Sequence, residues 1–143
     1  MKYTPDNIDK LDVNQIFVFG SNAKGIHGKG AAKLAKDKFG AIYGQAKGLQ
    51  GQSYAIITKK DWRIPKSSTP DEITQEFYEF LHFASDHPEL EFLVTKIGSS
   101  LAGYSIEEMK NIIRKACDIY MEVGESPIPN NVILPKEFEF RYD

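Results

Sequence analysis

The sequence predicts an α/β fold with a largely parallel sheet between helix layers. Short apolar runs typical of buried strands alternate along the chain with segments whose apolar residues recur at a helical period. Two loops that contain glycine each follow a predicted strand and lead into a predicted helix. Because ligands of such sheets sit beyond the carboxyl ends of the strands, we expect the two loops to meet there.

The first strand, loop and helix are predicted from residues 15–40. Ile16–Phe19 consists of β-branched and aromatic residues, the composition of a buried strand. The following loop contains four glycines, Gly20, Gly25, Gly28 and Gly30. Residues 31–39 are mostly strong helix formers, and Gly40 ends them. This order directs backbone N–H groups and a helix N-terminus to one spot, which favours an anion such as phosphate.

The spacing of this loop does not match the two best-known phosphate loops. A P-loop would need lysine and a hydroxyl residue after Gly25, where Ile26 and His27 stand. A dinucleotide fingerprint starting at Gly28 would need a third glycine where Lys33 stands. A simple connecting turn needs one or two residues with positive φ, not four glycines within eleven positions. We therefore interpret the segment as a ligand loop of another kind.

The next elements are a strand and a capped helix. Residues 1–14 are interpreted as an arm or a short helical turn, and residues 41–52 as a loop. Tyr54–Thr58 has the composition of a second buried strand. Thr69 and Glu72 form a capping box with Pro70 at the first helical position. The apolar face of this helix comprises Ile73, Phe77, Phe80, Leu81 and Ala84, and His87–Pro88 ends it.

The second half of the chain repeats the strand, loop and helix order. Phe92–Val94 is a third apolar strand, and residues 96–104 form the second glycine loop. Ser105 and Glu108 make another capping box. The buried face of the last helix is predicted to contain Ile106, Met109, Ile112, Ile113, Ala116 and Tyr120, with Cys117 in the core. Residues 131–134 are a short final strand, and residues 136–143 alternate like an edge strand or lie extended.

Composition indicates one soluble domain of 143 residues, with 41% hydrophobic and 27% charged residues. No apolar run approaches a membrane span, and no signal peptide is expected at the N-terminus. A single cysteine excludes an internal disulfide and a cysteine-based metal site, which favours a reducing cytoplasm. The net charge of −2 argues against duplex nucleic acid as a partner. We expect neither a metal nor a cofactor.

Basic residues gather around the first loop and the second strand. One acid, Asp37, accompanies the first group of Lys24, Lys29, Lys33, Lys36 and Lys38. Lys33 and Asp37 have the spacing of a helical ion pair, so part of this group is a solvated helix face. The second group is Lys59, Lys60 and Arg63. Lys59 and Lys60 end a predicted strand, at the edge of the sheet where a ligand is expected.

The two loops together resemble the macro domain, a family known for binding ADP-ribose. Ser21–Asn22 followed by Gly28-x-Gly30 is similar to the family's first loop, and the sequence IGSSLAGYS at residues 97–105 is similar to its second. The resemblance covers roughly Gln15 to Leu134 and implies a three-layer α/β/α fold. It is strongest to the branch of the terminal ADP-ribose–protein glycohydrolase, whose Ile-Thr-Lys-Lys strand end is matched by Ile57–Lys60.

The resemblance implies a role for each matched residue. Asn22 would contact the ribose distal to adenine, and the second loop would wrap the diphosphate, with Ser100 where glycine is usual. Asp12 is the candidate for the aspartate that reads adenine. The ligand-binding residues implied are Gly20, Ser21, Asn22, Gly25, His27, Gly28, Gly30, Lys59, Gly98, Ser99, Ser100, Leu101, Ala102, Gly103 and Tyr104.

Two catalytic positions of the family differ in this chain. Lys59 matches the lysine that attacks the sugar, but Ala102 stands where that branch has an acid/base aspartate. A second hydrolytic branch has an aspartate where Ala32 stands. Because a methyl group neither accepts nor delivers a proton, the catalytic candidates are reduced to Lys59 and His27.

Several of these residues also have structural interpretations. Lys59 is more simply explained as a phosphate-pairing charge. Asn22 could stabilise a turn, but its place within the loop favours contact with a ribose. His27 could contact a phosphate or hydrogen-bond the loop backbone, and we weigh these equally. The rings of Phe19 and Tyr104 are interpreted either as stacking surfaces or as packing, and Trp62 as the border or cover of the cleft.

Three functions are compatible with the sequence. The first is a module that binds ADP-ribose or a related nucleotide diphosphate through the loop amides and Asn22. The second is a hydrolase acting on ADP-ribosylated protein through Lys59, His27 or a ligand-positioned water. The third is an interaction protein that has kept the fold without the ligand. The alanines at the two aspartate positions favour binding over hydrolysis, and the intact loops favour it over a scaffold.

Overall fold

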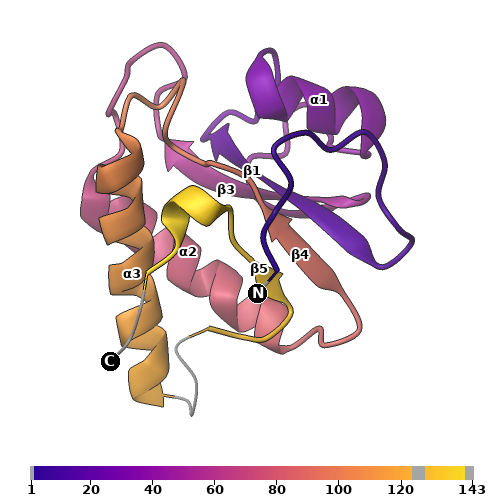
Figure 1. Cartoon of the computed structure of the whole chain (residues 1–143). Helices are drawn as coiled ribbons and strands as arrows, with labels where there is room; N and C mark the ends of the chain where they lie inside the picture. Colours follow the sequence, from indigo (N-terminus) through magenta and orange to yellow (C-terminus); the bar gives the residue numbers. More distant parts are fainter. Residues whose placement is uncertain (1, 124–127, 141–143) are drawn as a thin grey trace.

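The computed structural model describes residues 2–123 and 128–140 (Figure 1). Its elements are β1 (Gln15–Asn22), α1 (Gly30–Lys38), β2 (Gly48–Gln50), β3 (Ser53–Lys59), α2 (Pro70–Ser85), β4 (Glu91–Val94), α3 (Ile106–Val123), β5 (Val132–Ile133) and the 3-10 helix η1 (Lys136–Phe138). Within the described residues, no helix combines the length and the apolar character that a membrane span requires.

The five strands form one mixed sheet in the order β2-β3-β1-β4-β5. β1 is the central strand and runs parallel to both β3 and β4, and β4 runs parallel to β5. β2 pairs antiparallel with β3 at one edge. The carboxyl ends of the four parallel strands therefore lie on the same side of the sheet, and the loops that follow these strands lie there (Figure 1). The predicted α/β class with a largely parallel sheet is confirmed.

Successive side chains of β1 point to opposite faces of the sheet, so the hydrophobic core is divided between these two faces. Phe17 and Phe19 pack on one face with residues of α1, including Ala35. Ile16 and Val18 pack on the opposite face in the cluster that contains the apolar residues of α2 and α3. The sheet thus lies between α1 and the α2–α3 pair, as Figure 1 shows. The expected three-layer arrangement is present.

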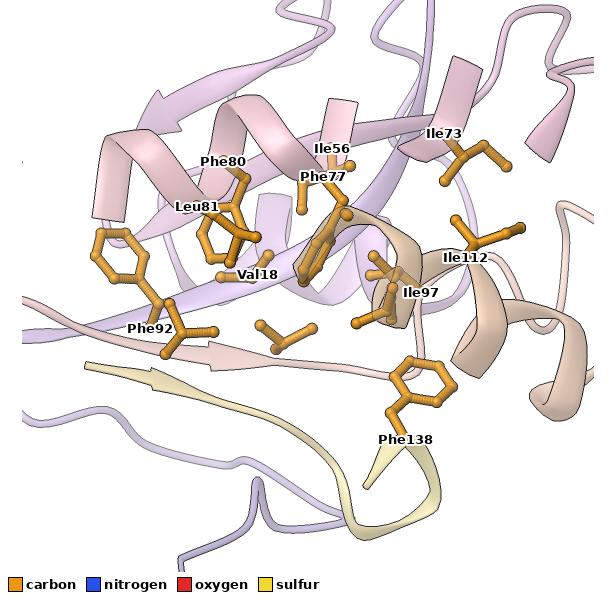
Figure 2. Packing of buried hydrophobic residues seen from close by; sticks show 14 of the residues in the cluster. Val18, Ile56, Ile73, Phe77, Phe80, Leu81, Phe92, Ile97, Ile112 and Phe138 are labelled. Carbon is orange, nitrogen blue, oxygen red and sulfur yellow. The ribbon is translucent and has the colours of Figure 1, made fainter. Parts of the chain in front are cut away.

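The larger core lies between the sheet, α2 and α3. Figure 2 shows Phe77 and Phe80 of α2 directed toward Val18 and Phe92 of the sheet. The rings of Phe77 and Phe80 are 5.3 Å apart, and both are fully buried. Every residue predicted for the apolar face of α2 is buried. On α3, Ile106 and Tyr120 are partly buried, and the predicted residues between them are buried with Cys117.

The two capping boxes predicted from sequence are both confirmed. At α2, the N–H of Glu72 donates to the Thr69 hydroxyl, and the Glu72 carboxylate accepts from the N–H of Thr69. At α3, Ser105 and Glu108 make the same reciprocal pair. Such a box satisfies N–H groups that a helix leaves without partners in its first turn. Both helices are therefore closed at their N-termini by their own residues.

Two segments differ from the prediction. Residues 41–52 contain the short strand β2, which forms a hairpin with β3 around Gly51, a residue with a positive φ of 61°. Three residues are too few to give a detectable period, so the sequence predicted only a loop. The tail forms η1 rather than an edge strand, because a turn at Pro135 buries the Phe138 ring against the larger core. Residues 141–143 of the predicted tail lie outside the described residues.

Candidate functional site

A cavity of about 560 Å³ lies beyond the carboxyl ends of β1, β3 and β4. Three stretches of chain line it, each of which contains the carboxyl end of one of these strands or the loop after it. They contribute Gly20, Ser21, Asn22, Ile26 and residues 28–32 from the end of β1 to the first turn of α1, Thr58, Lys59, Trp62 and Arg63 from the end of β3 and the turn after it, and residues 95–98 and 100–102 after β4. Its volume lies within the range of small-molecule sites. The expected meeting of the two glycine loops is confirmed.

Ten of the predicted ligand-binding residues line this cavity: Gly20, Ser21, Asn22, Gly28, Gly30, Lys59, Gly98, Ser100, Leu101 and Ala102. Ala32, the second alanine that stands where the resemblance noted above implies an aspartate, also lines it. Both alanines therefore lie at the cavity wall. Among the described residues of the lining there is no aspartate or glutamate.

Three predicted loop residues lie outside the lining. Gly25 has a φ of 69° and packs so closely against Gly44 that an added Cβ would lie 2.5 Å from a backbone carbon. Gly103 packs in the same way against Pro65. Ser99 lines a neighbouring cavity instead. These residues shape the loops, because the glycines permit close backbone contacts that a side chain would prevent.

His27 and Tyr104 point into the protein rather than into the cavity. The His27 side chain is fully buried, its Nε2 lies 3.1 Å from the carbonyl oxygen of Gln45, and its ring meets Phe19 edge-on. The Nδ1 atom has no hydrogen-bond partner in the described part of the chain. The Tyr104 hydroxyl donates to the carbonyl oxygen of Ser68. The structure thus favours loop anchoring over proton transfer for His27.

The Asn22 side chain is already engaged with its own loop. Its Oδ1 accepts from the N–H of Ile26 at 3.0 Å, and its Nδ2 donates to the carbonyl oxygen of Ile26 at 2.9 Å. The turn-stabilising interpretation is therefore confirmed. An amide group can make four hydrogen bonds, so one N–H and one acceptor position remain beyond the two bonds to Ile26. Asn22 both closes the loop and keeps limited capacity for a ligand.

The N-terminus of α1 opens on the cavity without a cap. Lys29 is the N-cap residue, it makes no side-chain capping bond, and the first turn contains no acid. The N–H groups of Gly30, Ala31 and Ala32 belong to this turn, and no acceptor for them is present among the described residues. α2 and α3 instead both start with a capping box and two acids. The positive end of α1 is thus left for another acceptor.

Four cations line the cavity, and two of them are neutralised by the protein. Arg63 pairs with Asp61 at 3.2 Å, which lowers the pKa of the Asp61 carboxyl. Lys96 contacts Glu137 at 2.9 Å, and this hydrogen bond raises the pKa of Lys96. Lys29 and Lys59 have no ion-pair partner in the described ranges of the chain. The cavity therefore carries positive charge without a matching acid.

A second cavity of about 400 Å³ adjoins the first. The two share Ala31, Thr95, Lys96 and Ser100, so they lie side by side. The N-terminal arm closes the second cavity through residues 4–9. Asp12, the candidate for reading adenine, does not lie here. The carbonyl oxygen of Asp12 accepts from the N–H of Gln15 at the start of β1. Asp12 therefore lies at the amino end of this strand, whereas the cavity lies at the carboxyl end. That assignment is wrong.

Sequence reasoning did not assign Lys29, Arg63 or Lys96 to the site, although all three line the cavity, and Trp62 lines it as the sequence suggested. Lys29 had a detectable signal, since it stands between two loop glycines. Lys96 is the second residue after β4, a position that usually faces a ligand in parallel sheets. Arg63 lies on a turn whose direction depends on contacts with the second loop, which no local pattern indicates.

Comparison with known proteins supports the fold alone. No protein-family model matches the chain, and no curated protein matches it either. The chain is similar to a solved structure of a protein of unknown function from Bacteroides thetaiotaomicron, with 19% sequence identity and a TM-score of 0.55. The similarity covers 89% of this chain and 90% of that one. The α/β architecture is thus found in a second protein over nearly the whole length.

Proposed function

We propose that the protein binds ADP-ribose or a related nucleotide diphosphate in the cavity between the two glycine loops. The observation that carries the proposal is the uncapped N-terminus of α1, which faces a cavity lined by cations and by no acid among the described residues. Helix N-termini with free N–H groups bind phosphate through both hydrogen bonds and the helix dipole. The diphosphate is assigned to the first turn of α1 and to the second loop at residues 98–102.

Charge balance identifies the residues that meet the ligand. Lys29 and Lys59 are the lining cations without an ion-pair partner in the described chain, so a diphosphate gains their charge without breaking an existing pair. Hydrogen bonds between ionised groups are about twice as strong as neutral ones. Asn22 offers its remaining N–H and acceptor position to a ribose hydroxyl. The ribose contact of Asn22 matches the role that the family resemblance implies for it.

A hydrolase acting on ADP-ribosyl groups is the second candidate. One observation favours it: Lys59 lines the cavity and has no ion-pair partner in the described part of the chain. Against it, Ala32 and Ala102 supply no proton-transfer group, and His27 is fully buried outside the lining. Binding without turnover is therefore the function that the geometry supports best.

Calorimetric titration with ADP-ribose tests the proposal, with inorganic pyrophosphate as the probe for the diphosphate alone. We expect both to bind, ADP-ribose more tightly, and Lys59→Ala to weaken both. Lys24→Ala is the matched control, because Lys24 is a lysine of the first glycine loop that lies outside the lining. A parallel turnover assay on ADP-ribosylated protein separates the candidates. Turnover abolished by Lys59→Ala would support the hydrolase, and the absence of any binding would refute both.

A further inference from the structure

Trp62 stands at the cavity with its ring partly open to solvent. It is the only tryptophan of the chain, it lines the cavity, and 43% of its surface is exposed. No aromatic stacking or cation–π partner of its ring is present among the described residues. A large aromatic side chain usually packs its surface or meets a partner. This ring instead offers its surface to whatever enters the site.

The turn that carries Trp62 is held in place before any ligand arrives. The Ser67 hydroxyl accepts from the N–H of Asp61 and donates to the carbonyl oxygen of Asp61, which closes the turn on itself. The N–H of Lys66 donates to the carbonyl oxygen of Ala102 at 2.7 Å, which ties the turn to the second glycine loop. The backbone that carries the ring is thus held at the cavity, so a ligand does not have to order this turn.

The sheet order places Trp62 and the second cavity on opposite sides of the α1 N-terminus. Trp62 follows β3, which lies on one side of the central strand β1. The second cavity is lined by the arm and by Thr95, Lys96 and Pro135, which follow β4 and β5 on the other side. A ligand whose diphosphate sits at the α1 terminus, after β1, therefore extends in both directions. One end enters the second cavity and the other reaches Trp62.

We propose that Trp62 is a stacking platform for a second planar aromatic ring, so that the preferred ligand is a dinucleotide with a base at each end of its diphosphate. This inference rests on the proposed function, because the diphosphate position sets the direction of both ends. Stacking a base on an exposed aromatic side chain is favourable for any base, since every base has a π-face. Such a platform adds affinity and does not select among bases.

Two ligands that differ in one ring test this inference. Diadenosine diphosphate carries a second adenine where ADP-ribose carries a free sugar hydroxyl. We expect the natural protein to bind diadenosine diphosphate about ten-fold more tightly, the size of one base–aromatic stacking interaction. Trp62→Leu keeps an apolar side chain without a π-face and should reduce this preference to about one, while Trp62→Phe should retain part of it. Affinity for ADP-ribose should change little in either variant.

Tyr43→Leu is the matched control, because Tyr43 is an aromatic residue that is 62% exposed and lies outside the lining. The fluorescence of the single tryptophan gives a second readout, and it should be quenched more by diadenosine diphosphate than by ADP-ribose. Equal affinity of the two ligands for the natural protein, or a preference that survives Trp62→Leu, overturns the platform. Failure of ADP-ribose and pyrophosphate to bind at all instead overturns the proposed function.

Discussion

Ala31 occupies a position where a carboxylate should stabilise the free protein and weaken the complex. It lies in the first turn of α1, is exposed, and lines both cavities. An acid in the first turn of a helix interacts with the positive end of the dipole and typically adds about 0.3–1 kcal/mol. Ala31→Asp should therefore raise the melting temperature of the free protein by about 1–3 °C.

The same aspartate should oppose the proposed diphosphate. An anion on the α1 N–H groups would lie roughly 5 Å from the new carboxylate, where two unit charges repel by about 3 kcal/mol at an effective dielectric constant of 20. Because residue 31 is exposed, solvent screening lowers this repulsion to about 1–2 kcal/mol. The dissociation constant for ADP-ribose should then rise about ten-fold.

Calorimetry and thermal unfolding of the same samples measure the two effects. Ala31→Asn is the control, because asparagine has nearly the same shape without the charge, and it should change affinity by no more than about two-fold. Raised salt should reduce the loss of affinity for Ala31→Asp, since screening weakens the repulsion. An aspartate variant that binds ADP-ribose as well as the natural protein would refute the placement of the anion at α1.

Three further predictions concern other parts of the molecule. Lys59→Gln should weaken ADP-ribose binding in calorimetry about five-fold, or about 1 kcal/mol, whereas Lys24→Gln should not change it. Equal losses of affinity in the two variants would contradict the assignment of Lys59 to the binding site. Gly98→Ala should lower the free energy of unfolding, measured in urea, by about 2–4 kcal/mol. The reason is that Gly98 has a φ of 73° and that the new Cβ would lie 2.4 Å from the Met109 sulfur. An unchanged free energy of unfolding would contradict this packing. Burial raises the pKa of the Cys117 thiol to about 12. A thiol reagent should therefore label Cys117 only after the protein is denatured. Fast labelling of the native protein would contradict the burial of this thiol.

The sequence predicted the framework of the site because its signals are local. The spacing of Ile73, Phe77 and Phe80 reports one helix face, and that face is buried in the structure. The capping residues Thr69 and Ser105 identified the starts of two helices, and both boxes form. Glycine loops after parallel strands must lie at one edge of the sheet, so their meeting followed from the strand order.

The direction of individual loop side chains could not be predicted in the same way. His27 stands among cavity-lining residues in the sequence, yet its side chain turns to the carbonyl oxygen of Gln45 in a different loop. Asp12 could be aligned with a family position, but the start of β1 lies at the far edge of the sheet. Both outcomes depend on contacts between distant segments, and a local pattern contains no information about such contacts.

The contrast among the three helices is the strongest physical argument for a ligand at α1. A helix without an N-capping side chain typically loses about 0.5–2 kcal/mol of stability, and a serine or aspartate in place of Lys29 could supply the missing hydrogen bond. Thr69 and Ser105 supply such a hydrogen bond to α2 and α3, whose N-termini lie outside the cavity lining. α1 instead begins with a lysine between two glycines and has no acid in its first turn. None of these residues brings a side-chain acceptor to the free N–H groups. A helix selected only for stability would fill these positions, whereas an anion site requires them to stay open.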